Sequence, residues 1–195
     1  RMAGVAICAA TDSQWYPKLA TDEASGAIIV WQDLRNGTDY DVYVQLVDST
    51  GVTQWTADGV AICSQSGDQV SQQIVADGAS GAIVVWKDDR NGTDSDIYAH
   101  LGDGSGAPQW TADGVAICSA TDDQASPSIA TDGAGGAVIA WEDNRSGTEA
   151  NIYAQKVDSS GVVQWTADGA VVCNESEDQT TAVIASDEGG GAIVA

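Results

Sequence analysis

Basic residues are scarce in this chain: Lys and Arg number 7 against 29 Asp and Glu, which gives a formal net charge of −22 over 195 residues. Binding to nucleic acid or to an anionic membrane surface depends on Lys and Arg that neutralise phosphates, so the composition argues against both partners. Long apolar runs are also absent. The longest are about five residues, whereas a membrane-spanning helix needs roughly 20. We therefore expect neither nucleic-acid binding nor membrane insertion.

Residues that carry common catalytic and metal chemistry are few. The chain has one histidine, His100, and no Cys-x-x-Cys pair, Gly-x-Ser-x-Gly motif or phosphate-binding loop. His100 stands where two related segments have Gln45 and Gln155, so we interpret it as a surface substitution rather than a catalytic base. We predict no catalytic residues, no cofactor and no metal site. None of the Asp-Gly turns fits a known calcium loop, which argues against calcium there, but calcium binding at these turns stays open.

What the chain does have is a period of 55 residues without insertion or deletion. It is followed by four cysteines and two series of tryptophans: Cys8, Cys63, Cys118 and Cys173; Trp31, Trp86 and Trp141; Trp55, Trp110 and Trp165. A fixed period of this length indicates a repeat architecture. Equivalent cysteines should lie one repeat apart, beyond the roughly 7 Å reach of a disulfide, so we interpret them as small buried hydrophobic residues.

Each repeat is predicted to contain four short strands. In the third repeat, apolar segments at 128–130, 136–141, 151–157 and 169–173 are separated by turns rich in Gly, Asp, Asn and Ser. This pattern is typical of antiparallel hairpins, and no apolar period of 3.6 residues persists. Four strands in a repeat of this length predict an all-β fold, a β-propeller of four-stranded antiparallel blades. A β-solenoid is the weaker alternative, because its repeats are usually shorter.

The repeat boundaries predict about three and a half blades. We expect a single propeller segment with a partial blade at 1–13, full blades at 14–63, 69–118 and 124–173, and a partial blade at 179–195. Closed propellers have about four to eight blades, and end repeats without polar caps expose apolar faces and strand edges. We therefore expect self-association through the end blades, with a seven-bladed ring of two chains as one model. A fragment of a longer chain is the simpler explanation.

The segment from Trp141 to Asp158 resembles the TolB-type propeller repeat, in which an apolar strand is followed by an Asp-Arg-x-Gly turn, a strand containing Ile-Tyr, and a closing turn. The match recurs at 86–103 and 31–48 and covers about a third of each repeat. The whole chain is similar to tandem 55-residue repeats of large secreted bacterial surface proteins. This resemblance implies an extracellular or cell-surface location, although no signal peptide is visible in the first three residues.

A loop of the form Asp-x-Arg-x-Gly occurs in each full repeat and contains three of the four arginines. Its members are Asp33, Arg35 and Gly37; Asp88, Arg90 and Gly92; and Asp143, Arg145 and Gly147. We predict an Asp–Arg ion pair that braces the turn, with the glycine supplying a positive φ. A binding site for an anion or an acidic sugar at the arginines is the alternative.

The two tryptophan series have different predicted roles. We expect Trp31, Trp86 and Trp141 to pack between blades. For Trp55, Trp110 and Trp165, each preceded by Gln and followed by Thr-Ala-Asp-Gly, stacking on a sugar stays open. Trp15 has no counterpart in the other repeats, so we expect it to be exposed.

A catalytic site needs several different groups in one asymmetric arrangement. The blades are nearly copies of one another, with no inserted loop and no unique polar cluster. We therefore predict a non-enzymatic scaffold or interaction module of a secreted or cell-surface bacterial protein, whose partner is a glycan or a surface protein. One alternative is a multivalent lectin-like propeller with a glycan site in each blade. A second is a sialidase-like glycosidase, because the turns 48–51 and 158–161 resemble the sialidase Asp-box, with the Trp one residue too far along.

Overall fold

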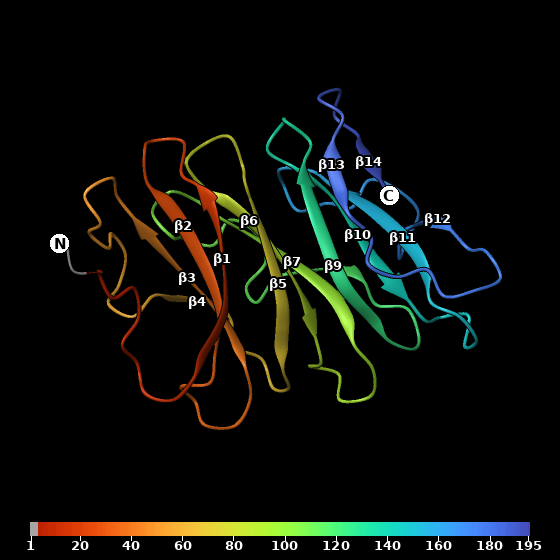
Figure 1. The fold of residues 1–195 in the computed structure, drawn as a ribbon, viewed down its shortest axis with the longest axis horizontal. Coiled ribbons are helices and arrows are strands. Elements are labelled where there is room, and N and C mark those ends of the chain that lie inside the picture. The colour runs from red at the N-terminus through yellow and green to blue at the C-terminus, as the bar shows by residue number, and fades with distance from the viewer. Residues whose placement is uncertain (1–3) are drawn as a thin grey trace.

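The computed structural model describes residues 4–195, so the first three residues of the predicted partial blade at 1–13 lie outside it. Every regular element in this range is a β-strand. The strands form three complete sheets and one hairpin that follow one another across the molecule (Figure 1). No helix in residues 4–195 is long and apolar enough to cross a membrane.

Each complete sheet has four strands that pair in chain order. The first contains β1 (Gln14–Thr21), β2 (Ala27–Asp33), β3 (Asp41–Val47) and β4 (Val60–Cys63); the second contains β5 (Gln69–Ala76), β6 (Ala82–Asp88), β7 (Asp96–Gly102) and β8 (Val115–Cys118); the third contains β9 (Gln124–Thr131), β10 (Ala137–Asp143), β11 (Asn151–Val157) and β12 (Ala170–Cys173). The hairpin β13 (Ile184–Ser186) and β14 (Ala192–Val194) follows. All pairings are antiparallel, which confirms the predicted all-β fold of four-stranded blades.

The blades pack face to face, and their first strands lie side by side. Strand β5 contacts both β1 and β9, and β9 contacts β13 (Figure 1). Apolar side chains fill the space between adjacent sheets; Val85 and Ile97 of the second blade pack with Ile139 and Trp141 of the third. Because β6 and β10 are covered on both faces, their residues are buried almost without alternation, which explains the continuous apolar runs before each tryptophan.

The segment 4–8, part of the predicted partial blade at 1–13, forms no strand. The residues at its end still contact the first blade. The last strands of the first two complete blades are followed by equivalent contacts with the next blade. The Ala9 amide donates to Asp58 Oδ1 at 2.7 Å, and the Cys8 Sγ lies 3.3 Å from Arg35 Nη2. The equivalent amides, Ser64 and Ser119, donate to Asp113 and Asp168. The docking contacts therefore form without a neighbouring strand.

His100 is buried, with 1% of its surface exposed, so its interpretation as a surface substitution is wrong. The equivalent Gln45 explains why this position faces inward. Its Oε1 accepts hydrogen bonds from the amides of Leu46 and Trp55, and its Nε2 donates to the Thr56 carbonyl oxygen. His100 lacks this set of groups, and its Nδ1 is buried without a partner. Burial lowers the pKa of His100, since the charged imidazolium loses its hydration.

We expect His100→Gln to stabilise the protein by about 1–2 kcal/mol, because it removes a buried unpaired nitrogen and restores the hydrogen bonds of the sister blades. Urea unfolding at pH 7 measures this change. Gln155→His is the matched control and should lower the free energy of unfolding by a similar amount. An unchanged or lower stability of His100→Gln would contradict this explanation of the buried position.

Candidate functional site

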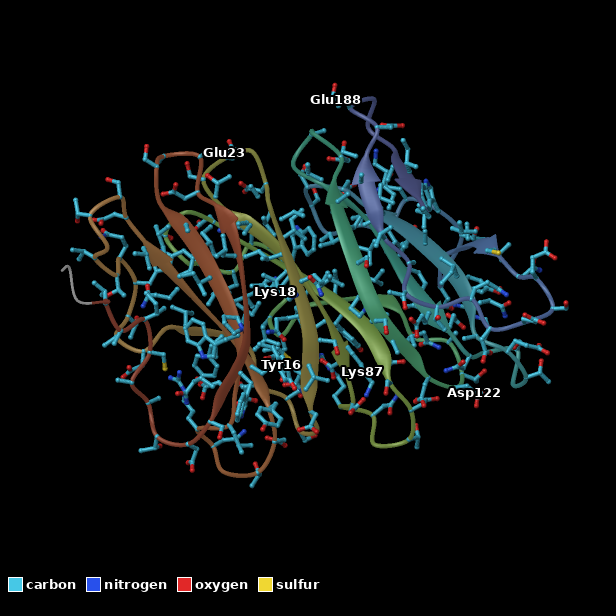
Figure 2. All side chains as sticks on the ribbon, in the orientation of Figure 1. Tyr16, Lys18, Glu23, Lys87, Asp122 and Glu188 are labelled. Carbon is cyan, nitrogen blue, oxygen red and sulfur yellow. The ribbon has the colours of Figure 1, made fainter. Side chains whose placement is uncertain are left out.

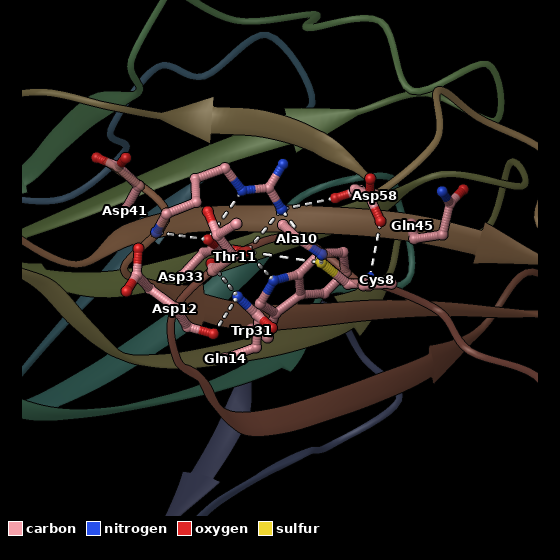
Figure 3. A network of polar contacts seen from close by, with 12 residues as sticks. Cys8, Ala10, Thr11, Asp12, Gln14, Trp31, Asp33, Asp41, Gln45 and Asp58 are labelled. Carbon is pink, nitrogen blue, oxygen red and sulfur yellow. Dashed lines mark hydrogen bonds and ion pairs between the residues drawn. The ribbon is translucent and has the colours of Figure 1, made fainter. Parts of the chain in front are cut away.

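The aspartate of each Asp-x-Arg loop is buried and accepts several hydrogen bonds; Figure 3 shows those of Asp33. Trp31 and Asp33 are two residues apart on β2 and so lie on the same face of the strand. Asp33 Oδ2 accepts from Trp31 Nε1 at 2.7 Å, and Asp33 receives the Arg35 guanidinium at 2.8 and 2.6 Å. Burial alone would raise the pKa of Asp33, but the hydrogen bonds from Arg35 and Trp31 outweigh it and lower the pKa.

The arginine of the loop is engaged on several sides. The Arg35 guanidinium lies 3.7 Å over the Tyr43 ring and donates to the Asp58 carbonyl oxygen at 2.7 Å. We call this set of contacts around Asp33 and Arg35 the Asp–Arg lock. It recurs around Asp88 and Arg90, and around Asp143 and Arg145. The loop glycines Gly37, Gly92 and Gly147 have φ of 76°, 72° and 72°. Ligand binding at the three arginines stays a prediction.

The cysteines belong to the same arrangement and are not joined by disulfides. Cys63 and Cys118 lie beneath Arg90 and Arg145, with Sγ–Nη2 distances of 3.2 and 3.1 Å. Burial raises the pKa of both thiols to about 12, so they stay protonated at neutral pH. Within residues 4–195, no group of three or more His, Cys, Asp and Glu is placed to hold a metal ion.

The tryptophans that were considered as sugar platforms differ in exposure. Trp110 is 7% exposed and donates from Nε1 to the Ser159 carbonyl oxygen, under the loop of the next blade. Gly161 approaches this ring so closely, at φ 81°, that a Cβ there would lie 2.8 Å from it. Trp55 is covered in the same way, whereas Trp165 is 41% exposed. Sugar stacking by these residues stays a prediction. The other series, Trp31, Trp86 and Trp141, is buried as predicted.

The hairpin between the second and third strands of the first two blades carries a buried acidic residue. Asp41 is 3% exposed; its Oδ2 accepts from Asn36 Nδ2 at 3.0 Å, and its Oδ1 has no partner. Burial and the neighbouring charges of Asp39 and Asp33 raise the pKa of Asp41 to about 6. Asp96, its equivalent, also has a pKa raised to about 6.

The raised pKa values of Asp41 and Asp96 make the stability of the protein depend on pH. Between about pH 4 and 6 the native state binds more protons at Asp41 and Asp96 than the unfolded chain does, so stability falls as pH rises through this range. Asp41→Asn with Asp96→Asn should raise the free energy of unfolding at pH 7.5 by about 1–2 kcal/mol per site and have little effect near pH 3.5. The third blade already has Asn151 at this position. Urea unfolding at both pH values measures the effect, and an equal gain at both would contradict it.

A cavity of about 590 Å³ lies where the first strands of the blades meet. Its wall contains Tyr16 and Lys18 from β1, Gln72 from β5 and Ser126 from β9, among other residues of these strands. Tyr16 and Lys18 lie near the middle of the molecule, away from its outer loops (Figure 2). The lining is a mixture of hydroxyl, amide and apolar groups, a composition common in ligand sites.

The backbone at this cavity has an unusual conformation that is the same in every repeat. Tyr16, Ser71, Ser126 and Thr181 have φ of 52°, 58°, 51° and 61°. In the three complete blades the residue sits at a register shift between the first and second strands. A non-glycine residue in this region costs about 1–2 kcal/mol, and such bulges are frequent beside binding sites.

Divergence between the repeats is concentrated at this cavity. The residues 15–18 read Trp-Tyr-Pro-Lys, whereas the equivalent residues read Val-Ser-Gln-Gln, Ala-Ser-Pro-Ser and Thr-Thr-Ala-Val. The position after the buried tryptophan is Gln32, Lys87 and Glu142 in successive repeats. The prediction that the chain has no unique polar cluster is therefore wrong. The sequence shows this cluster only as positions at which the repeats differ. It does not show that these residues line one cavity.

Glu142 is the carboxylate in the cavity wall, and it is held by the next blade. Its Oε1 accepts a hydrogen bond from the Thr181 amide at 2.7 Å. Its Oε2 makes no hydrogen bond within the part of the chain that the structure describes. The Glu142 side chain is half-buried. The hydrogen bond from Thr181 fixes Oε1, whereas Oε2 can contact a ligand.

No protein-family model and no curated protein sequence matches this chain. Its fold resembles those of solved structures, two of which are as follows. An endo-arabinase from Bacteroides thetaiotaomicron superposes with a TM-score of 0.56 at 14% identity, over 95% of this chain and 70% of its own. An α-L-arabinanase from Penicillium chrysogenum, in complex with arabinobiose, superposes with a TM-score of 0.54 at 12% identity, over 93% of this chain and 58% of its own. The chain is a β-propeller.

These comparisons contradict the prediction of a non-enzymatic scaffold, because both proteins of similar fold are glycan-cleaving enzymes. The prediction was wrong because the blades are not uniform copies. Their outer strands are nearly identical, but the first strands differ where they meet. The fold therefore supplies one asymmetric cavity.

Proposed function

We propose that this chain is part of a glycan-cleaving β-propeller, with the central cavity as the substrate site and Glu142 as a carboxyl group that acts on the glycosidic bond. The observation that carries the proposal is the position of Glu142. It is the acidic residue in the cavity wall, and its Oε1 is fixed by the Thr181 amide. The two solved structures of similar fold, both arabinan-cleaving enzymes by name, support the reaction class.

A glycosidase of the common type uses two carboxyl groups, one as proton donor and one as base or nucleophile, about 5–10 Å apart. In our proposal Glu142 is the proton donor: Oε1 is held by the backbone, and Oε2 gives its proton to the glycosidic oxygen. The second carboxyl group comes from further blades that complete the ring. These blades belong to a second copy that associates through the end blades, or to further repeats of the same protein.

The resemblance to tandem repeats of secreted bacterial surface proteins supports an extracellular location. The formal net charge of −22 keeps a protein of this kind soluble.

The test is hydrolysis of linear arabinan and arabino-oligosaccharides, measured as released reducing ends, together with the mass of the protein in solution by light scattering. Glu142→Gln should lower the rate by about 100-fold or more, the scale of a lost acid–base group, and should retain oligosaccharide binding. Glu188→Gln is the control, since Glu188 lies at the outer edge of the molecule (Figure 2). Equal rates for both variants, or no hydrolysis and no binding of any glycan by the assembled protein, would contradict the proposal.

A further inference from the structure

One basic side chain differs from the others in residues 4–195. Five of the six make ion pairs: Arg35 with Asp33, Lys87 with Asp89, Arg90 with Asp88, Arg145 with Asp143, and Lys156 with Asp132. The sixth, Lys18, makes no ion pair and no hydrogen bond within this range, although acidic residues greatly outnumber basic ones. It is exposed and stands in the wall of the central cavity (Figure 2).

The charge at this position is specific to the first blade. The equivalent residues are Gln73, Ser128 and Val183, of which the first two also line the cavity and none is charged. The same wall contains the buried amide of Gln72. Gln72 is 1% exposed, its Nε2 donates to the Tyr16 carbonyl oxygen at 2.6 Å, and its Oε1 is buried without a partner. This contact fixes the bulge of β1, which places Lys18 at the cavity.

Lys18 can attract an anion in spite of the overall charge. At physiological ionic strength the Debye length is about 8 Å, so exposed charges farther away are largely screened and the nearest groups dominate. One ammonium group balances one negative charge. A singly charged carboxylate therefore suits this site better than a doubly charged phosphate.

We propose that the cavity selects an acidic glycan, in which the carboxylate of a uronic acid unit pairs with Lys18. The sugar hydroxyls then exchange hydrogen bonds with the Ser71 and Ser126 side chains of the same wall. This inference rests on the proposed function, because it names the substrate class for the same site. It also gives the cavity a direction, with the acidic unit at β1 and the reacting bond at Glu142.

The test is isothermal titration of the assembled protein with trigalacturonate and with neutral arabinotriose, at 50 and 300 mM NaCl. We expect tighter binding of trigalacturonate, with an affinity that falls as salt rises. Lys18→Gln copies Gln73 of the sister blade and should fold normally. It should weaken trigalacturonate binding about tenfold, the loss of one charge-assisted contact, and leave arabinotriose unaffected. Lys156→Gln makes the same change in net charge outside the cavity and should have little effect.

The outcomes separate this inference from the proposed function. Binding of arabinotriose without binding of trigalacturonate would overturn the acidic-glycan inference and leave the glycan-cleaving proposal standing. Binding of trigalacturonate that is equally weakened by Lys156→Gln and Lys18→Gln would overturn the role of Lys18. If the assembled protein binds neither trigalacturonate nor arabinotriose, both proposals are overturned.

Discussion

The buried carboxylate of the Asp–Arg lock is the group on which the blade depends. Asp33 joins the tryptophan of its own strand to the arginine of the following turn, and that arginine reaches the Asp58 carbonyl oxygen and the Cys8 thiol beyond it. Removal of one partner from such a buried pair typically costs 3–5 kcal/mol, since it leaves an uncompensated charge. Every full repeat keeps these residues without change. The lock thus holds together the turns and the ends of strands within each blade and connects each blade to the one before it.

Because the lock and the apolar runs define the outer part of each blade, the first strand is free to vary. Its side chains meet those of neighbouring blades around the central cavity, where one residue of each of the four repeats has a positive φ and the three complete blades carry a bulge. The first strands of the blades have similar backbones but different side chains, so the repeated fold forms an asymmetric site. This separation of a constant frame from a variable inner strand is the physical basis of the proposed glycan site.

Much of the fold could be predicted from the sequence, because the 55-residue period and the turn residues reflect local hairpin geometry. The buried tryptophans followed from the same pattern. The burial of His100 did not, since it depends on the three hydrogen bonds that Gln45 makes in the sister blade. The positive φ of Ser71 and Ser126 has no sequence signature, because serine does not require it. The site was missed because its members come from different repeats and converge only in three dimensions.

The proposed site places the ligand at the inner strands and not at Trp55, Trp110 and Trp165. The most direct measurement is a map of amide chemical shifts by NMR as arabinotriose or trigalacturonate is added to the labelled protein. We expect shift changes concentrated at residues 70–73, 125–128 and 180–182, with Glu142 and Lys18 among the affected residues. Shift changes confined to the loops around Trp55, Trp110 and Trp165 would contradict it and would place the sugar on the outer face of the blades.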